Sequence, residues 1–166
     1  MRAKIKSQTA LARIAARLHR AKKRIVFTNG CFDIIHRGHV EYLNEAKSLG
    51  DFLVVGLNSD SSVKKLKGSG RPVVGEIDRA FVLSSLKPVD CVIIFGEETP
   101  YELIKFVRPD FLVKGGDWKK DNIVGSDIVE GYGGKVISLK FVDSYSSTGL
   151  IDKIKNDPVL KPHASK

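Results

Sequence analysis

Two histidines three residues apart, His36 and His39, are the side chains of this sequence best suited to chemistry on a phosphate. They follow the apolar segment RIVFTNG at 24–30, which is typical of a buried strand that runs into a turn. In the first turn of a following helix, this spacing puts both imidazoles on one face. The N–H groups and dipole of a helix N-terminus favour an anion, and Gly38 lets it approach the backbone closely. The pattern therefore indicates hydrogen bonds to a phosphoryl group as its charge develops.

Simpler interpretations of the two histidines stand beside this one. Either ring alone is more often a surface or capping residue than a ligand. A zinc site is weakly supported, because no third His, Cys or acidic residue lies at ligand spacing. The first strand is followed by no G-x-G-x-x-G, and the chain contains no P-loop motif, no G-x-S-x-G elbow and no evident Cys–His nucleophile arrangement.

The elements that must position these residues alternate along the chain. Apolar strands are expected at 24–30, 51–58, 89–95, 110–116 and 135–139. Helices are expected at 39–50, 59–66, 77–86, 99–107, 126–134 and 147–155, and a Gly- and Pro-rich loop at 68–76. Near-continuous apolar strands separated by helices predict an α/β fold, a doubly wound, Rossmann-like parallel sheet of five strands with helices on both faces. Ligands of such sheets bind outside the carboxyl ends of the strands.

Composition places the chain among soluble globular proteins. It has 166 residues, 42% of them hydrophobic and 28% charged, which suits one domain. No apolar run approaches the roughly 20 residues of a membrane span, and no secretory signal is present. Cys31 and Cys91 lie among apolar residues and form no framework, so both thiols are expected to be free in a reducing compartment, here the cytoplasm.

The net charge of +9 belongs to one segment. Residues 1–24 hold nine Lys and Arg and no acid, whereas the remaining 19 basic residues balance 19 acidic ones. Leu11, Ile14 and Leu18 recur at helical spacing, which predicts a basic amphipathic helix over about 8–22. Three interpretations stay open: a docking helix with a solvated basic face, a binder of an acidic partner, lipid or nucleic acid, and an organelle transit peptide. We expect this segment at 1–23, a domain at 24–156 and a flexible tail at 157–166.

The H-x-G-H corner after a first strand resembles the nucleotidyltransferase superfamily, which moves a nucleotidyl group onto a phosphate or carboxylate and releases pyrophosphate. Over about residues 24–155, the blocks TNGCFDIIHRGH, LKGSGRP, DRAFVLSSL, KGGDW and YSSTGLI resemble the branch of D-glycero-β-D-manno-heptose 1-phosphate adenylyltransferases. This resemblance implies transfer of AMP from ATP, with Mg²⁺, to a heptose 1-phosphate for the lipopolysaccharide core.

The resemblance also implies roles for individual residues. The catalytic candidates are His36, His39, Lys67 and Arg79. The nucleotide-binding candidates are Thr28, Asn29, Gly30, Phe32, Asp33, Gly38, Asn58, Arg71, Gly115, Asp117, Ser147 and Thr148. Lys114 is the candidate for the sugar phosphate, and Asp33 for orienting the acceptor or a magnesium ion; no metal ligand is assigned. Each role has a simpler alternative. Lys67 and Arg71 could be solvated loop residues, Asp117 a turn residue and Ser147 a helix cap. The roles of Trp118 and Tyr145 stay open.

The resemblance further implies partners and leaves alternatives. Many members carry a fused sugar kinase for which 166 residues leave no room, so we expect a separate kinase and phosphatase upstream. A homodimer is compatible with relatives that often dimerise, with the N-terminal helix as one candidate interface. A cytidylyltransferase acting on glycerol 3-phosphate is the first alternative, weakened because KFVDSYSST lacks the arginine of that branch. Nucleic-acid or membrane-surface binding through the basic helix is the second, and the neutral body argues against it as the main function, so no nucleic-acid partner is expected.

Overall fold

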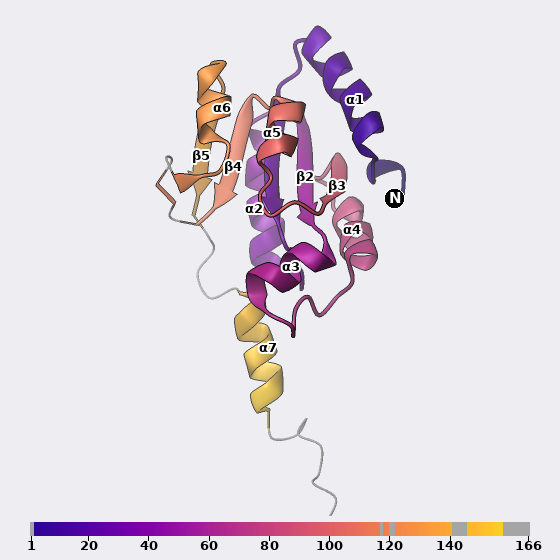
Figure 1. Cartoon of the computed structure of the whole chain (residues 1–166), viewed down its shortest axis with the longest axis vertical. Coiled ribbons are helices and arrows are strands. Elements are labelled where there is room, and N and C mark those ends of the chain that lie inside the picture. Colours follow the sequence, from indigo (N-terminus) through magenta and orange to yellow (C-terminus); the bar gives the residue numbers. More distant parts are fainter. Residues whose placement is uncertain (1, 117, 120–121, 141–145, 158–166) are drawn as a thin grey trace, which may run out of the picture.

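The five strands form one parallel sheet in the order β3-β2-β1-β4-β5 (Figure 1). The computed structural model describes residues 2–116, 118–119, 122–140 and 146–157. The strands are β1 (Ile25–Gly30), β2 (Phe52–Asn58), β3 (Cys91–Phe95), β4 (Phe111–Gly115) and β5 (Lys135–Leu139). The helices are α1 (Gln8–Arg20), α2 (Arg37–Ser48), α3 (Asp60–Lys67), α4 (Glu76–Ser85), α5 (Tyr101–Val107), α6 (Ser126–Gly131) and α7 (Ser147–Asn156), after a short 3-10 turn at Arg2–Lys4.

Strand β1 lies at the centre of the sheet. It pairs with β2 on one side and with β4 on the other, so that Thr28 lies opposite both Val55 and Val113. The strand order changes side at β1, because β2 and β3 lie on one side of it and β4 and β5 lie on the other. The ends of β1 and β4 therefore form the switch point at which such folds bind ligands.

Helices cover both faces of the sheet, which confirms the predicted doubly wound fold. On one face, α1, α5 and α6 pack over Phe27, Val54 and Leu112. On the other, α2 and α4 pack over Val26 and Val55. Strands buried on both faces read as continuous apolar runs, which is why the sequence revealed them.

The thiol of Cys91 belongs to this core. Burial raises its pKa to about 12, so the group stays a neutral thiol at physiological pH.

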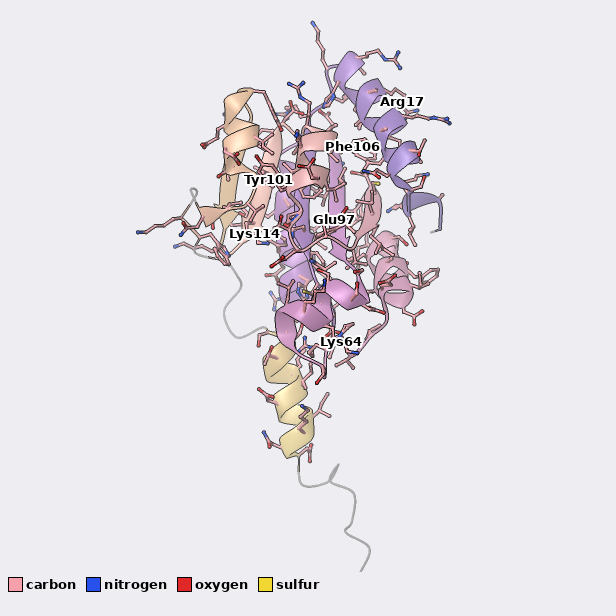
Figure 2. The ribbon with its side chains drawn as sticks, viewed as in Figure 1. Arg17, Lys64, Glu97, Tyr101, Phe106 and Lys114 are labelled. Atoms are coloured by element: carbon pink, nitrogen blue, oxygen red, sulfur yellow. The ribbon has the colours of Figure 1, made fainter. Side chains whose placement is uncertain are left out.

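The N-terminal segment is packed against the sheet. Leu11 and Ala15 of α1 are buried in the core, and α1 contacts α5 and β3. Ile5 forms a bridge with Val92, which extends the edge of the sheet beside β3. The basic side chains, such as Arg17, point outward (Figure 2). The structure thus favours the docking-helix interpretation, because the apolar face that a membrane-surface helix would insert is already covered.

The C-terminal helix α7 differs from the others because none of its residues is buried. It extends from the end of the domain near α3 (Figure 1). The Ser146 side chain caps it by accepting a hydrogen bond from the Gly149 N–H at 2.8 Å. In the part of the chain that is described, no helix is long and apolar enough to cross a membrane.

Candidate active site

A cleft of about 350 Å³ opens at the carboxyl ends of β1 and β4. Its walls combine backbone, two lysines, a histidine and aromatic rings. The lining residues are Asn29, Gly30, Cys31, Phe32, Asp33, His39, Tyr42, Lys67, Lys114, Gly115, Trp118 and Ser147. Nine of these twelve were site candidates from the sequence, and the switch point brings them together from six separate elements and loops.

The two histidines meet at the start of α2. His36 is the N-cap residue in extended conformation, and α2 begins at Arg37, two residues before the predicted start. The rings of His36 and His39 stack with centroids 3.8 Å apart and planes at 24°. The ring of Phe32, whose φ of 42° lies in the left-handed region, is 5.3 Å from that of His39. The first turn of α2 therefore presents an imidazole pair beside the N–H groups of a helix terminus.

Both imidazoles are held in the neutral form. Burial lowers the pKa of His36. Burial, then the neighbouring His36 and Lys67, lowers the pKa of His39 to about 4. The Nδ1 atom of His39 is buried and has no hydrogen-bond partner among the described residues. Buried polar atoms are normally paired, so this nitrogen fits a site completed by a ligand or water.

We expect the histidine pair to make folding stability depend on pH. Between pH 6.5 and about 4, the unfolded chain binds a proton that the folded His39 does not, so the free energy of unfolding falls as pH is lowered. Urea unfolding at several pH values measures this slope. His39→Gln should flatten it, whereas His19→Gln, at an exposed ring on α1, should leave it unchanged. An identical slope in His39→Gln and the wild type would contradict the assignment.

Two lysines supply positive charge to the cleft. Lys67 ends α3, and Lys114 reaches from β4 to lie 3.4 Å from Oδ1 of Asn29. Burial lowers the pKa of Lys114. Among the residues that the structure describes, neither lysine forms an ion pair with a carboxylate. Uncompensated cations beside neutral imidazoles suit an anionic ligand.

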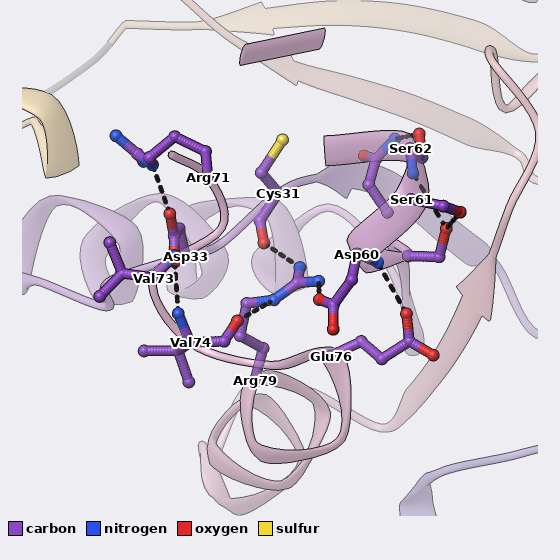
Figure 3. A network of polar contacts seen from close by, with 12 residues as sticks. Cys31, Asp33, Asp60, Ser61, Ser62, Arg71, Val73, Val74, Glu76 and Arg79 are labelled. Carbon is purple, nitrogen blue, oxygen red and sulfur yellow. Dashed lines mark hydrogen bonds and ion pairs between the residues drawn. The ribbon is translucent and has the colours of Figure 1, made fainter. Parts of the chain in front are cut away.

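Asp33 lines the cleft as expected, and its carboxylate is hydrogen-bonded to the protein. Its Oδ1 accepts the N–H groups of Val73 and Val74 at 2.8 and 3.0 Å, and its Oδ2 accepts from Nε of Arg71 at 2.6 Å (Figure 3). Burial alone would raise the pKa of Asp33, but these hydrogen bonds outweigh it and hold the pKa below its usual value. Both oxygens accept hydrogen bonds from the segment at 71–74, so the carboxylate holds the loop at 68–75 against the end of β1. That Asp33 orients an acceptor or magnesium stays a prediction.

Arg79 is placed differently from the prediction. Its side chain is fully buried, and each of its three guanidinium nitrogens bonds to a protein oxygen. It is not among the described residues that line the cleft. The prediction placed Arg79 near the phosphates. In the structure its guanidinium lies beside the loop at 68–75 and donates to oxygens of the protein instead.

Other predicted residues lie around the cleft rather than in its wall. Thr28 and Asn58 are buried and bond to Tyr42 and Ser62, respectively. Gly38 is buried in the first turn of α2. Arg71 bonds to Asp33, and its Nη2 is buried with no partner in the described part of the chain.

The last two predicted segments lie near the ends of β4 and β5. Ser147 donates to the carbonyl of Ile34 at 3.0 Å and lines the cleft, whereas Thr148 is exposed on α7. Asp117 and Tyr145 lie outside the described residues, and their roles stay predictions. Trp118, whose role the sequence left open, lines the cleft and donates from Nε1 to the Gly115 carbonyl at 3.0 Å.

Sequence reasoning missed Cys31 and Tyr42. Tyr42 follows His39 by three residues, and this helical spacing was the signal that placed it on the same face. Its buried hydroxyl donates to the Val113 carbonyl at 3.2 Å, which leaves the Thr28 hydroxyl, 2.6 Å away, to donate to Tyr42. Burial raises the pKa of Tyr42, so the hydroxyl keeps its proton. One phenol thus joins α2 to both strands of the switch point.

We expect Tyr42→Phe to lower the free energy of unfolding by about 2 kcal/mol, because it leaves buried partners unsatisfied. Thr28→Val removes the neighbouring hydroxyl but keeps a side chain of similar shape. The double variant should cost less than the sum of the two single variants, since both lose the same contact. Urea denaturation measures all three. Strict additivity would contradict a shared Tyr42–Thr28 hydrogen bond.

Among the described residues, no group of three or more His, Cys, Asp or Glu side chains could hold a metal ion. Asp33 is the one carboxylate among the described residues that line the cleft, and its oxygens are already bonded.

A five-stranded parallel sheet with an H-x-G-H corner at its switch point defines an α/β domain of the nucleotidyltransferase type. A family described as cytidylyltransferase-like matches residues 27–153, and the chain belongs to this family. The family membership confirms the predicted class.

Two relatives are more than half identical to this chain over most of its length. The chain is 54% identical over 153 residues to the "Bifunctional protein HldE" of Aliarcobacter butzleri, covering 92% of this chain and 31% of that protein. It is 52% identical over 157 residues to the "Bifunctional protein HldE" of Geotalea uraniireducens, covering 95% and 32%. The chain therefore spans about a third of the length of these relatives.

Two crystal structures resemble the fold. The "lipopolysaccharide core biosynthesis protein" from Thermoplasma volcanium GSS1 is 33% identical with a TM-score of 0.60, covering 75% of this chain and 99% of that one. The pantoate-beta-alanine ligase from Francisella tularensis, complexed with beta-gamma ATP and beta-alanine, is 16% identical with a TM-score of 0.58, covering 90% and 77%. At that identity the second likeness shows the fold alone.

Proposed function

We propose that this chain transfers AMP from ATP to D-glycero-β-D-manno-heptose 1-phosphate, giving ADP-heptose and pyrophosphate. One observation carries the reaction type: His39, whose ring stacks on that of His36, lines the switch-point cleft together with two lysines that form no ion pair with a carboxylate among the described residues. The acceptor is named by the sequence blocks that resemble heptose 1-phosphate adenylyltransferases. Relatives called HldE, together with a similar structure from lipopolysaccharide core biosynthesis, support it.

The proposed mechanism is a single in-line displacement. A phosphate oxygen of the sugar phosphate is already anionic at pH 7, so it attacks the α-phosphorus of ATP without a general base. The bond from the α-phosphorus to the bridging oxygen breaks, and pyrophosphate leaves. Magnesium enters with the nucleotide as part of the substrate and neutralises charge on the leaving group.

The residues of the chain act on charge and position. His36 and His39 are neutral, so they donate hydrogen bonds to phosphoryl oxygens without an ammonium-like charge of their own. Lys67 and Lys114 supply positive charge to the triphosphate and to the sugar phosphate, respectively. Because there is little covalent chemistry for the protein to perform, positioning and charge stabilisation account for most of the rate.

The proposed substrates imply a setting. A heptose 1-phosphate must be produced by a kinase and a phosphatase acting earlier, and we propose that these reactions and this one take place in the cytoplasm, where ATP is available. A homodimer stays a prediction. The apolar face of its candidate interface, the N-terminal helix, is packed against its own domain, which leaves the basic face of α1 exposed.

A labelling experiment tests the reaction. The full chain is incubated with magnesium, ATP labelled at the α-phosphate and the heptose 1-phosphate. We expect the label in the sugar nucleotide and none in pyrophosphate. Label in free AMP at the same rate with or without acceptor would indicate a hydrolase and would contradict the proposal.

A further inference from the structure

Three segments of the chain meet at the guanidinium of Arg79, in what we call the Arg79 network: Arg79, Cys31, Val74 and Asp60 (Figure 3). Nη1 donates to the Cys31 carbonyl at 2.5 Å, in the connection from β1 to α2. Nε donates to the Val74 carbonyl at 2.8 Å, in the loop at 68–75. Nη2 donates to Oδ1 of Asp60 at 2.7 Å, on the first residue of α3.

The geometry of these contacts requires an arginine. Its planar fork offers donors in fixed directions, and here one fork reaches acceptors from three different segments. The side chain has no exposed surface, whereas that of Asp60 is 46% exposed. A buried cation is costly unless its donors are satisfied, so all three segments must be in place when the domain is folded.

Helix α3 connects this network to the cleft. Asp60 begins the helix and Lys67 ends it, a span of about 10 Å at the usual helical rise. The start of α3 is held twice, because the Asp60 N–H also donates to Glu76 on α4 at 2.7 Å. Fixing Asp60 therefore fixes the direction of the helix, and with it the place of Lys67 opposite His39.

We propose that Arg79 is a positioning residue that acts through Lys67, rather than a group that touches the phosphates. This inference rests on the proposed adenylyl transfer, which supplies the assay. Its physical basis is that every guanidinium nitrogen already serves the protein, while Lys67 reaches the cleft from the helix that Arg79 anchors. Lys67 is the cationic side chain that contacts the nucleotide, and Arg79 fixes the position of Lys67.

A double-mutant cycle tests the proposal. Lys67→Ala is measured in the wild type and in Arg79→Lys, which keeps the charge but cannot reach three acceptors. We expect Arg79→Lys alone to lower kcat by about 10²-fold, the scale of a misplaced catalytic group. Lys67→Ala should cost about 10²-fold in the wild type but less than about threefold in Arg79→Lys, because the lysine is already out of place. Equal costs in both backgrounds would overturn the proposal.

Two further variants keep the result interpretable. Asp60→Asn loosens α3 without changing Arg79, so it should also reduce the cost of Lys67→Ala; it carries the cycle if Arg79→Lys does not fold. Lys47→Met removes a remote, half-buried ion pair with Asp90 and is the matched control. It should lower stability yet leave the cost of Lys67→Ala unchanged. A reduced cost in Lys47→Met as well would assign the effect to general destabilisation and overturn the proposal. Wild-type protein without turnover would instead refute the proposed function.

Discussion

His39→Ala is expected to lower kcat for AMP transfer by about 10²- to 10³-fold, the cost of one oriented hydrogen-bond donor at developing charge. The ring lines the cleft, stacks 3.8 Å from His36 and stands at the start of α2. Its Nδ1 has no partner among the described residues, so the protein loses little when the ring is removed. The loss should therefore appear in turnover rather than in stability.

The comparison with other histidines makes this test specific. His36→Ala should show a loss of the same order, because the two rings form one stacked pair. His19→Ala is the control, since that ring is exposed on α1 and bonds to the Arg108 carbonyl far from the cleft. Pyrophosphate release measures all three. Rates for His36→Ala and His39→Ala both within a few-fold of the wild type would contradict the assigned role.

Asp33→Asn is expected to have the largest effect on stability, about 3 kcal/mol. The change removes a carboxylate that is fully buried and whose partner Arg71 is only 12% exposed. An amide can accept with one oxygen, so its NH₂ group must face either the N–H groups of Val73 and Val74 or the guanidinium. The loop at 68–75 should then detach from the end of β1, and activity should fall with it.

Urea denaturation and a matched variant check this expectation. Asp51→Asn also loses a carboxylate that accepts a backbone N–H and pairs with a lysine, but at an exposed site. It should change the free energy of unfolding much less. Because the folded pKa of Asp33 lies below its usual value, the wild-type advantage over Asp33→Asn should shrink as pH falls below 3.8. A loss below about 0.5 kcal/mol for Asp33→Asn would contradict the stabilising role of the buried Asp33 carboxylate.

The fold was predictable because its signals are local. Strands buried on both faces, such as β2 and β3, read as largely apolar runs, and glycine marked the end of α2 near Gly50. The start of α2 was set two residues late, since Arg37 and Gly38 add nothing to an apolar stripe. The turn at 2–4 packs against α4, and Ile5 forms a bridge with Val92, so both depend on partners more than 70 residues away and no local pattern predicted them.

The part of the site that is contiguous in sequence was also predictable. The His36–His39 pair needed one motif, and Asn29, Gly115 and Lys114 follow from the rule that strand ends meet at the switch point. The protein partners of Arg79 and Asp33 could not be predicted, for a common reason. Residue type reveals a charge but not whether its partner is a ligand or the protein. Apart from Val74, which lies 5 residues from Arg79, their partners lie 19 to 48 residues away.

The central claim is tested most directly by pyrophosphate release from the full chain with magnesium. ATP or CTP is supplied as the donor, and D-glycero-β-D-manno-heptose 1-phosphate or glycerol 3-phosphate as the acceptor. The account predicts turnover for only one of the four combinations, ATP with the heptose phosphate. Turnover with CTP and glycerol 3-phosphate instead, or with none of the four combinations, would contradict it.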